Sequence, residues 1–161
     1  MKAIGIIPAR MGASRFPGKP LAKMLGMPMV GHCYHRTRLA PGLDAAYVAT
    51  CDDAIADYVR GIGGNVVMTA ASHNRATTRT AEALELIERE TGEQIDIVVM
   101  VQGDEPLISP ASTTKVPKDS PLIIRLRLGK LIFSGLVKSG NSERTAPFFC
   151  IISANFLFSE G

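Results

Sequence analysis

Short apolar runs alternate with helix-like segments along the first hundred residues, and this alternation constrains the fold more than any other feature. The apolar runs cover residues 4–7, 45–50, 65–69 and 95–101. Each has the length of a buried strand rather than of a helix. Strands that alternate with helices are typical of a parallel sheet covered on both faces. We therefore expect an α/β protein, a three-layer αβα sandwich with a mostly parallel sheet.

Helix signals lie between the predicted strands, over residues 27–42, 54–64 and 77–93. The middle segment follows Asp52 and Asp53, residue types that accept hydrogen bonds from the first backbone N–H groups of a helix. Gly63 and Gly64 are suited to closing the same helix. We expect both aspartates to act as capping residues.

Length and composition indicate one globular domain. The chain has 161 residues, 46% of them hydrophobic and 20% charged, which supports a sizeable core. We expect a single domain over 1–161, with a binding core at 1–110 and an atypical segment at 111–161. No apolar run reaches the roughly 20 residues that cross a bilayer. Three widely spaced cysteines are typical of reduced thiols, so we expect a cytoplasmic protein without membrane association.

Positive charge is concentrated near the start of the chain. Residues 1–38 contain seven Lys and Arg and no Asp or Glu, although the net charge of the whole chain is only +3. Such a field favours an anionic ligand, and charge alone is equally compatible with a solvated basic face. Ligands of parallel α/β sheets bind at the carboxyl ends of the strands. The loops expected there are 8–20, 50–53, 70–79 and 102–106, which is where the unusual residues lie.

The first of these loops carries Arg10, Ser14, Arg15 and Lys19 among prolines and glycines. Its glycine spacing matches neither a Walker A loop nor a G-x-G-x-x-G motif, and Pro20 follows the lysine. Arginine forks and a lysine charge are suited to a triphosphate and to the charge on a leaving pyrophosphate. Prolines restrict the loop, so that less entropy is lost when an anion binds.

At this point the chain resembles a known family. The stretch "PARMGASRFPGKPL" (8–21) is similar to the P-A-R signature, with its following Ser, Arg and Lys, of nucleotidyltransferases that activate sugars. Three further segments match in order: "VATCDD" (48–53), "VVMTAASHNRATTR" (66–79) and "VVMVQGDEPLI" (98–108). The closest resemblance is to the cytidylyltransferases that make CMP-3-deoxy-manno-octulosonate (CMP-Kdo), and it covers about two-thirds of the chain.

The resemblance implies a fold and a reaction. The fold would be nucleotide-diphospho-sugar transferase-like and related to the Rossmann fold. CTP and Kdo, or a similar 2-keto sugar acid, would give the CMP-sugar and pyrophosphate with Mg²⁺, for lipopolysaccharide or surface-polysaccharide synthesis. Members form homodimers. The implied triphosphate ligands are Arg10, Ser14, Arg15 and Lys19; Arg79 and Gln102 would place nucleotide or sugar, Asp104 would hold Mg²⁺, and Arg10, Lys19 and Asp104 would be catalytic.

Some positions depart from the family pattern. Thr78 stands where members commonly have an acid before the arginine, and Cys51 is inserted before Asp52. Residues 111–146 match no family segment, and only Asp119 lies downstream to complete a metal site. The alternative function is therefore a catalytically degenerate member that binds nucleotide or acts in assembly.

Other interpretations fit less well. A nucleic-acid-binding domain would be expected to show a recognition motif, and aromatic residues make up only 6% of the chain. His32, Cys33 and His35 lack the further Cys/His pairs of a metal site. The stretch 122–137, with Gly129-Lys130 as a turn, predicts a hairpin or a dimer contact rather than a membrane-surface element.

Overall fold

The computed structural model of the chain describes residues 2–12, 16–113 and 148–152. Its main sheet has the strand order β5-β4-β1-β6-β7, and every neighbouring pair is parallel. The strands are β1 (Ala3–Pro8), β4 (Ala45–Thr50), β5 (Asn65–Met68), β6 (Ile97–Val101) and β7 (Phe148–Ile152). The four strands predicted from the apolar runs are all present, and the parallel arrangement is confirmed.

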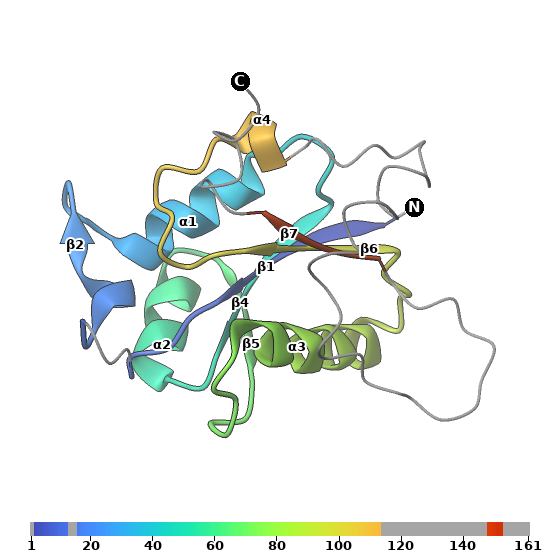
Figure 1. The fold of residues 1–161 in the computed structure, drawn as a ribbon, viewed down its shortest axis with the longest axis horizontal. Coiled ribbons are helices and arrows are strands. Elements are labelled where there is room, and N and C mark those ends of the chain that lie inside the picture. Colours follow the sequence, from blue (N-terminus) through green and yellow to red (C-terminus); the bar gives the residue numbers. More distant parts are fainter. Residues whose placement is uncertain (1, 13–15, 114–147, 153–161) are drawn as a thin grey trace.

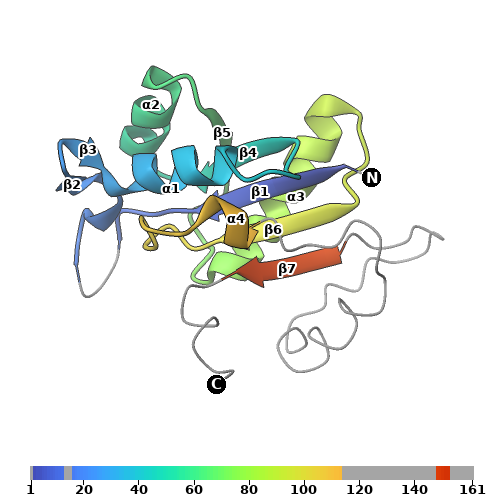
Figure 2. The same cartoon turned by 90° about the horizontal axis from the view of Figure 1, so that it is seen from above.

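Helices cover both faces of this sheet, as the alternation of strands and helices predicts. They are α1 (Met29–Arg38), α2 (Asp53–Gly61), α3 (Ala76–Thr91) and the short α4 (Pro110–Thr113). Figure 1 shows α1 and α3 on opposite sides of the sheet, and Figure 2 gives the view from above. The described part of the chain is therefore the expected αβα sandwich.

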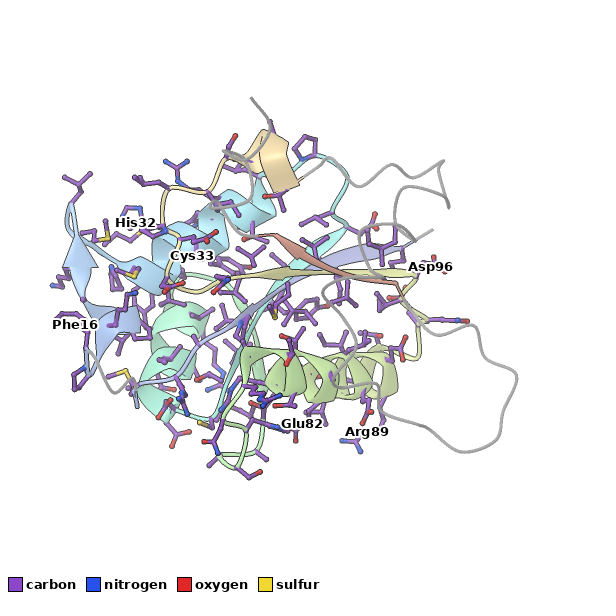
Figure 3. All side chains as sticks on the ribbon, viewed as in Figure 1. Phe16, His32, Cys33, Glu82, Arg89 and Asp96 are labelled. Carbon is purple, nitrogen blue, oxygen red and sulfur yellow. The ribbon has the colours of Figure 1, made fainter. Side chains whose placement is uncertain are left out.

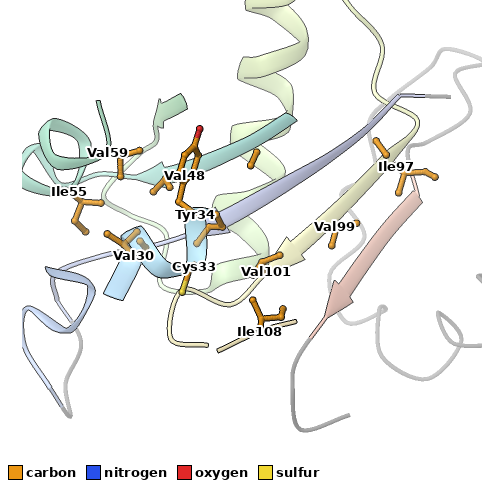
Figure 4. Close-up of a cluster of buried hydrophobic side chains, with 14 residues drawn as sticks. Val30, Cys33, Tyr34, Val48, Ile55, Val59, Ile97, Val99, Val101 and Ile108 are labelled. Atoms are coloured by element: carbon orange, nitrogen blue, oxygen red, sulfur yellow. The ribbon is translucent and has the colours of Figure 1, made fainter. Parts of the chain in front are cut away.

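The core divides into two apolar clusters, one on each side of the sheet. Ile4 and Ile6 of β1 pack with the α3 side chains, whereas Ile7 packs with those of α1 and α2. Figure 4 shows the second cluster, in which Val30 and Tyr34 of α1 meet strand residues. Because successive side chains of a strand point to opposite faces, one apolar run supplies both clusters.

A small antiparallel hairpin precedes α1 and was not expected from the sequence. It pairs β2 (Lys23–Met24) with β3 (Met27–Pro28). Leu25 and Gly26 form its turn with φ of 50° and 85°, the left-handed values typical of tight hairpin turns. The helix predicted over 27–42 therefore begins at Met29, because the two preceding residues belong to a strand.

The carboxyl ends of β1, β4, β5 and β6 lie at one edge of the sheet, on the left in Figure 1. Several predicted features lie outside the described residues: Ser14, Arg15, Asp119 and the hairpin at 122–137. Within the described ranges, no helix is long and apolar enough to span a bilayer.

Candidate nucleotide site

The basic loop after β1 is closed at its base by Met11. The Met11 carbonyl oxygen accepts a hydrogen bond from the Gly18 backbone N–H at 3.1 Å. Gly18 has a left-handed φ of 74°, which favours glycine, and it immediately precedes the 3₁₀ turn η1 (Lys19–Leu21). Arg10 directly precedes Met11, and Lys19 directly follows Gly18. The closure, which we call the neck of the loop, therefore holds the exposed Arg10 and the half-buried Lys19, nine positions apart in sequence, at its two ends.

Lys19 and Asp104 meet directly at this edge of the sheet. The Lys19 Nζ lies 3.0 Å from Asp104 Oδ2, and the two side chains are 35% and 52% exposed. The sequence assigned these residues to a triphosphate and a metal, and the structure brings them together from loops 85 positions apart. An ion pair this exposed is weakly stabilising, so both partners can exchange for ligand groups at small cost.

Gly103 explains how the Asp104 loop comes so close to β1. A Cβ atom on Gly103 would lie 2.9 Å from the Pro8 carbonyl oxygen, closer than real Cβ contacts allow. Gln102, the half-buried residue at the carboxyl end of β6, accepts a hydrogen bond from the Glu105 N–H through its own carbonyl. The loop is thus a compact turn pressed onto the end of β1.

α1 supports the same region with residues that the sequence left as weak metal candidates. Cys33 is buried, and desolvation raises the pKa of its thiol to about 12, opposed by a hydrogen bond with the Glu105 backbone. His32 bonds through Nε2 to the Met24 carbonyl oxygen at 2.8 Å and so holds the hairpin (Figure 3). Among the described residues, no three His, Cys, Asp or Glu side chains form a metal-binding group.

Arg79 lies at the same edge, next to the carboxyl ends of β4 and β5, and its side chain is buried. Only 2% of the residue is exposed. Its guanidinium donates to the Thr69 hydroxyl, to Cys51 Sγ at 3.4 Å and to the His73 carbonyl oxygen at 3.3 Å. The cation that the sequence assigned to nucleotide or sugar is thus hydrogen-bonded to two loops of the protein, the one after β4 and the one after β5.

The loop before α3 is held by the carboxylate of Glu82, which lies about two turns into that helix. Glu82 Oε2 accepts from the Ala70 N–H at 2.9 Å and lies 2.6 Å from His73 Nε2. Thr78, the residue that stands in place of the family's acid, donates its hydroxyl to the Arg75 carbonyl at 3.0 Å. Figure 3 shows Glu82 on α3. The loop is therefore held by a carboxylate that the motif comparison did not identify.

Asp52 has a different role from the predicted one. It is the N-cap residue of α2 by position, but its side chain makes no capping hydrogen bond. Its Oδ2 instead accepts the Met11 backbone N–H at 2.8 Å. Asp53 forms the first turn of α2 and is exposed. The prediction that both side chains cap the helix is thus wrong: the Asp52 carboxylate is used by the loop after β1, and Asp53 is the first residue inside the helix.

Together these features define an α/β protein with a basic loop and a facing carboxylate at the carboxyl edge of its sheet, the edge at which parallel α/β proteins bind their ligands. The sequence model of the family described as Cytidylyltransferase matches residues 4–119. This chain belongs to that family.

Individual relatives agree with this assignment. An 8-amino-3,8-dideoxy-manno-octulosonate cytidylyltransferase of Shewanella frigidimarina is 48% identical over 116 residues, which are 72% of this chain and 46% of the relative. The mitochondrial 3-deoxy-manno-octulosonate cytidylyltransferase of Arabidopsis thaliana is 49% identical over 109 residues, 68% of this chain and 36% of its own length. The chain thus spans less than half the length of these two relatives.

Solved structures give the same fold. CMP:2-keto-3-deoxy-manno-octonic acid synthetase complexed with CTP superposes with a TM-score of 0.60 at 40% identity, over 68% of this chain and 43% of that one. A cytidylyltransferase of Leptospira borgpetersenii gives a TM-score of 0.56 at 28% identity, over 68% and 44%. The expected α/β fold is therefore shared with solved members of the family.

Proposed function

We propose that this chain is the nucleotide-binding part of a cytidylyltransferase that activates a 2-keto sugar acid with CTP. The observation that carries the proposal is the meeting of Lys19 and Asp104, at 3.0 Å, on the carboxyl edge of the sheet in a member of this family. Its relatives include 3-deoxy-manno-octulosonate and 8-amino-3,8-dideoxy-manno-octulosonate cytidylyltransferases, which supports a Kdo-like sugar acid as substrate.

In the proposed reaction a sugar hydroxyl oxygen attacks the α-phosphorus of CTP. The new P–O bond forms as the bond from the α-phosphorus to the α–β bridging oxygen breaks. Pyrophosphate leaves with the electron pair of that bond, and the hydroxyl proton passes to water. Arg10 and Lys19, with Ser14 and Arg15, bind the triphosphate. Gln102 helps to place nucleotide or sugar directly, and the buried Arg79 does so through the loops that it holds. The protein's contribution is mainly positioning and neutralisation of charge on the leaving group.

The reaction is proposed to use Mg²⁺, with Asp104 as its protein ligand. A lone exposed carboxylate is not a metal cage, but Mg²⁺ in nucleotide sites keeps several waters and binds one or two carboxylates plus substrate phosphates. Asp104 fits that requirement, since its charge projects beyond the end of β6 beside a phosphate-binding lysine. When bound, the ion would neutralise phosphate charge.

Pyrophosphate release tests the function. Purified protein is incubated with CTP, Mg²⁺ and Kdo, and pyrophosphate is measured against a heat-denatured sample. Release that requires all three components is the expected result. CTP binding without release would favour the alternative, a nucleotide-binding or assembly protein. The specific observation behind that alternative is that no three His, Cys, Asp or Glu side chains form a group able to hold a metal ion within the described ranges.

The wider setting follows from the same family membership. We propose a cytoplasmic enzyme of lipopolysaccharide or surface-polysaccharide synthesis that acts as a homodimer and associates with neither membrane nor nucleic acid. The thiols of Cys33 and Cys51, both free, support a reducing compartment. Light scattering of the purified protein gives the oligomeric state, and a monomeric mass would remove the dimer from the proposal.

A further inference from the structure

The base of the basic loop is fixed from both sides at a single residue, Met11. Its carbonyl oxygen receives the Gly18 N–H at 3.1 Å, and its own N–H is donated to Asp52 Oδ2 at 2.8 Å. The first contact closes the loop on itself, whereas the second ties it to the next strand of the sheet. Asp52 is thus the side chain that anchors the neck between Arg10 and Lys19.

The Asp52 side chain makes this contact in place of the capping hydrogen bond that is usual for an N-cap aspartate. An aspartate at the N-cap of a helix normally accepts a hydrogen bond from a backbone N–H of the first turn. The Asp52 side chain makes no such bond to α2. Its backbone is instead held in place by the Thr50 hydroxyl, which accepts the Asp52 N–H at 3.1 Å. The carboxylate is therefore directed away from the helix that it precedes and toward the loop.

The same carboxylate connects the loop to the buried arginine. The Cys51 thiol lies 3.7 Å from Asp52 Oδ2, at hydrogen-bonding distance for sulfur, and the Arg79 guanidinium donates to that sulfur at 3.4 Å. Three contacts in series thus join α3, the end of β4 and the loop after β1. A shift of the Asp52 carboxylate would disturb the loop on one side and the Cys51–Arg79 contact on the other.

From this geometry we infer that Asp52 is a positioning residue for triphosphate binding. Its carboxylate sets the peptide between Arg10 and Met11 and holds the neck whose two ends carry the phosphate-binding cations. It touches no substrate itself and acts through the loop. The inference rests on the proposed function for its ligand, CTP, but the anchoring contact belongs to the ligand-free protein and can be tested there.

Amide hydrogen exchange of Met11, followed by NMR in the ligand-free protein, tests the contact. Asp52→Ser is the main variant, since serine is also a favoured N-cap residue but is too short to reach the loop. Asp52→Asn keeps an acceptor oxygen at the right length. Asp53→Ser is the matched control, because Asp53 is the exposed neighbour on α2.

Met11 exchange should become at least about tenfold faster in Asp52→Ser, the effect of losing a hydrogen bond to a charged group. It should stay within about threefold of wild type in Asp52→Asn and Asp53→Ser. Unchanged exchange in Asp52→Ser would overturn the inference. If Asp52→Ser does not fold, the inference stands or falls with Asp52→Asn, whose Met11 N–H must remain protected.

Calorimetric titration with CTP and with CMP then separates positioning from general stability. Asp52→Ser should weaken CTP binding about tenfold and CMP binding less than threefold, because the loop holds the triphosphate. Equal loss for both ligands, or no loss for CTP, would contradict the positioning role. Failure of the wild-type protein to bind CTP would remove the proposed function, whereas the Met11 measurement would still decide whether Asp52 sets the loop.

Discussion

Two cations lie at the carboxyl edge of the sheet, and they differ in almost every physical respect. Lys19 is one-third exposed and paired with the exposed Asp104. Arg79 is 2% exposed, and its guanidinium donates to a hydroxyl, a thiol and a carbonyl. Separating the exposed Lys19–Asp104 ion pair costs little free energy, whereas removing the buried Arg79 guanidinium from its partners costs much more. We infer that the Lys19–Asp104 region performs the chemistry and that the Arg79 region builds the scaffold beneath it.

Removal of the exposed Asp104 carboxylate should have the largest effect on activity. Asp104→Ala should lower the kcat of pyrophosphate release about 10²–10³-fold, the usual effect of losing a group that stabilises transition-state charge. The free energy of unfolding should change by less than about 0.5 kcal/mol, because exposed ion pairs contribute little. Asp57→Ala removes another exposed, ion-paired carboxylate and should alter neither quantity. An Asp104→Ala variant that turns over normally would contradict the assignment.

Removing the buried cation should have the opposite profile. Arg79→Ala should lower the free energy of unfolding by about 2–4 kcal/mol, because it leaves a cavity and takes a donor from buried partners. Urea denaturation measures this change. Arg89→Ala, on the exposed side of the same helix (Figure 3), should stay within about 0.5 kcal/mol of wild type. Equal stability of the two variants would show that Arg79 is not part of the scaffold.

A substitution at Gly103 tests whether the Lys19–Asp104 region depends on the close packing of the Asp104 loop against β1. Gly103→Ala places a methyl group against the Pro8 carbonyl oxygen and should cost about 1–3 kcal/mol of stability, together with weaker CTP binding. Gly61→Ala is the control, since nothing lies within 4 Å of its Cβ position in α2. That variant should be neutral or slightly stabilising. A fully stable Gly103→Ala would mean that the loop can retreat from β1 without loss.

The last effect, absent at neutral pH, concerns Cys33, whose thiol lies beside the backbone of the Asp104 loop. Burial raises the pKa of its thiol from 9.0 to about 12 in the folded protein. The contribution of the neutral thiol to stability is therefore complete below pH 9.0 and is lost as the pH rises toward 12, because the unfolded thiol ionises first. The slope is at most about 1.4 kcal/mol per pH unit. Denaturation at several pH values should show a smaller slope in Cys33→Ala than in wild type, and identical slopes would contradict the assignment.

Much of the fold could be predicted from the sequence, because the apolar runs are local signals. The hairpin could not, since β2 and β3 have two residues each and no alternation to detect. The burial of Arg79 had a signal that we missed: it lies four and eight positions before Ala83 and Ile87, both buried on α3, and so belongs to the helix face that packs on the sheet.

The site was predictable in its residue types but not in its contacts. Lys19 and Asp104 were assigned from motifs, and the rule for parallel sheets places both at one edge. The contact of Asp52 with Met11 joins residues 41 positions apart, and local rules assign that aspartate to the helix. Such a contact follows only from the way that β1 and β4 lie side by side.

Calorimetric titration with CTP and Mg²⁺ tests whether the basic loop binds the triphosphate. The titration compares Lys19→Ala with wild type and with Lys23→Ala. Lys23 is an exposed cation of the nearby hairpin and serves as the control. Wild type and Lys23→Ala should bind CTP within about threefold of each other, and Lys19→Ala should bind it at least about tenfold more weakly. Equal affinity of all three proteins would contradict the assignment of the basic loop to the triphosphate.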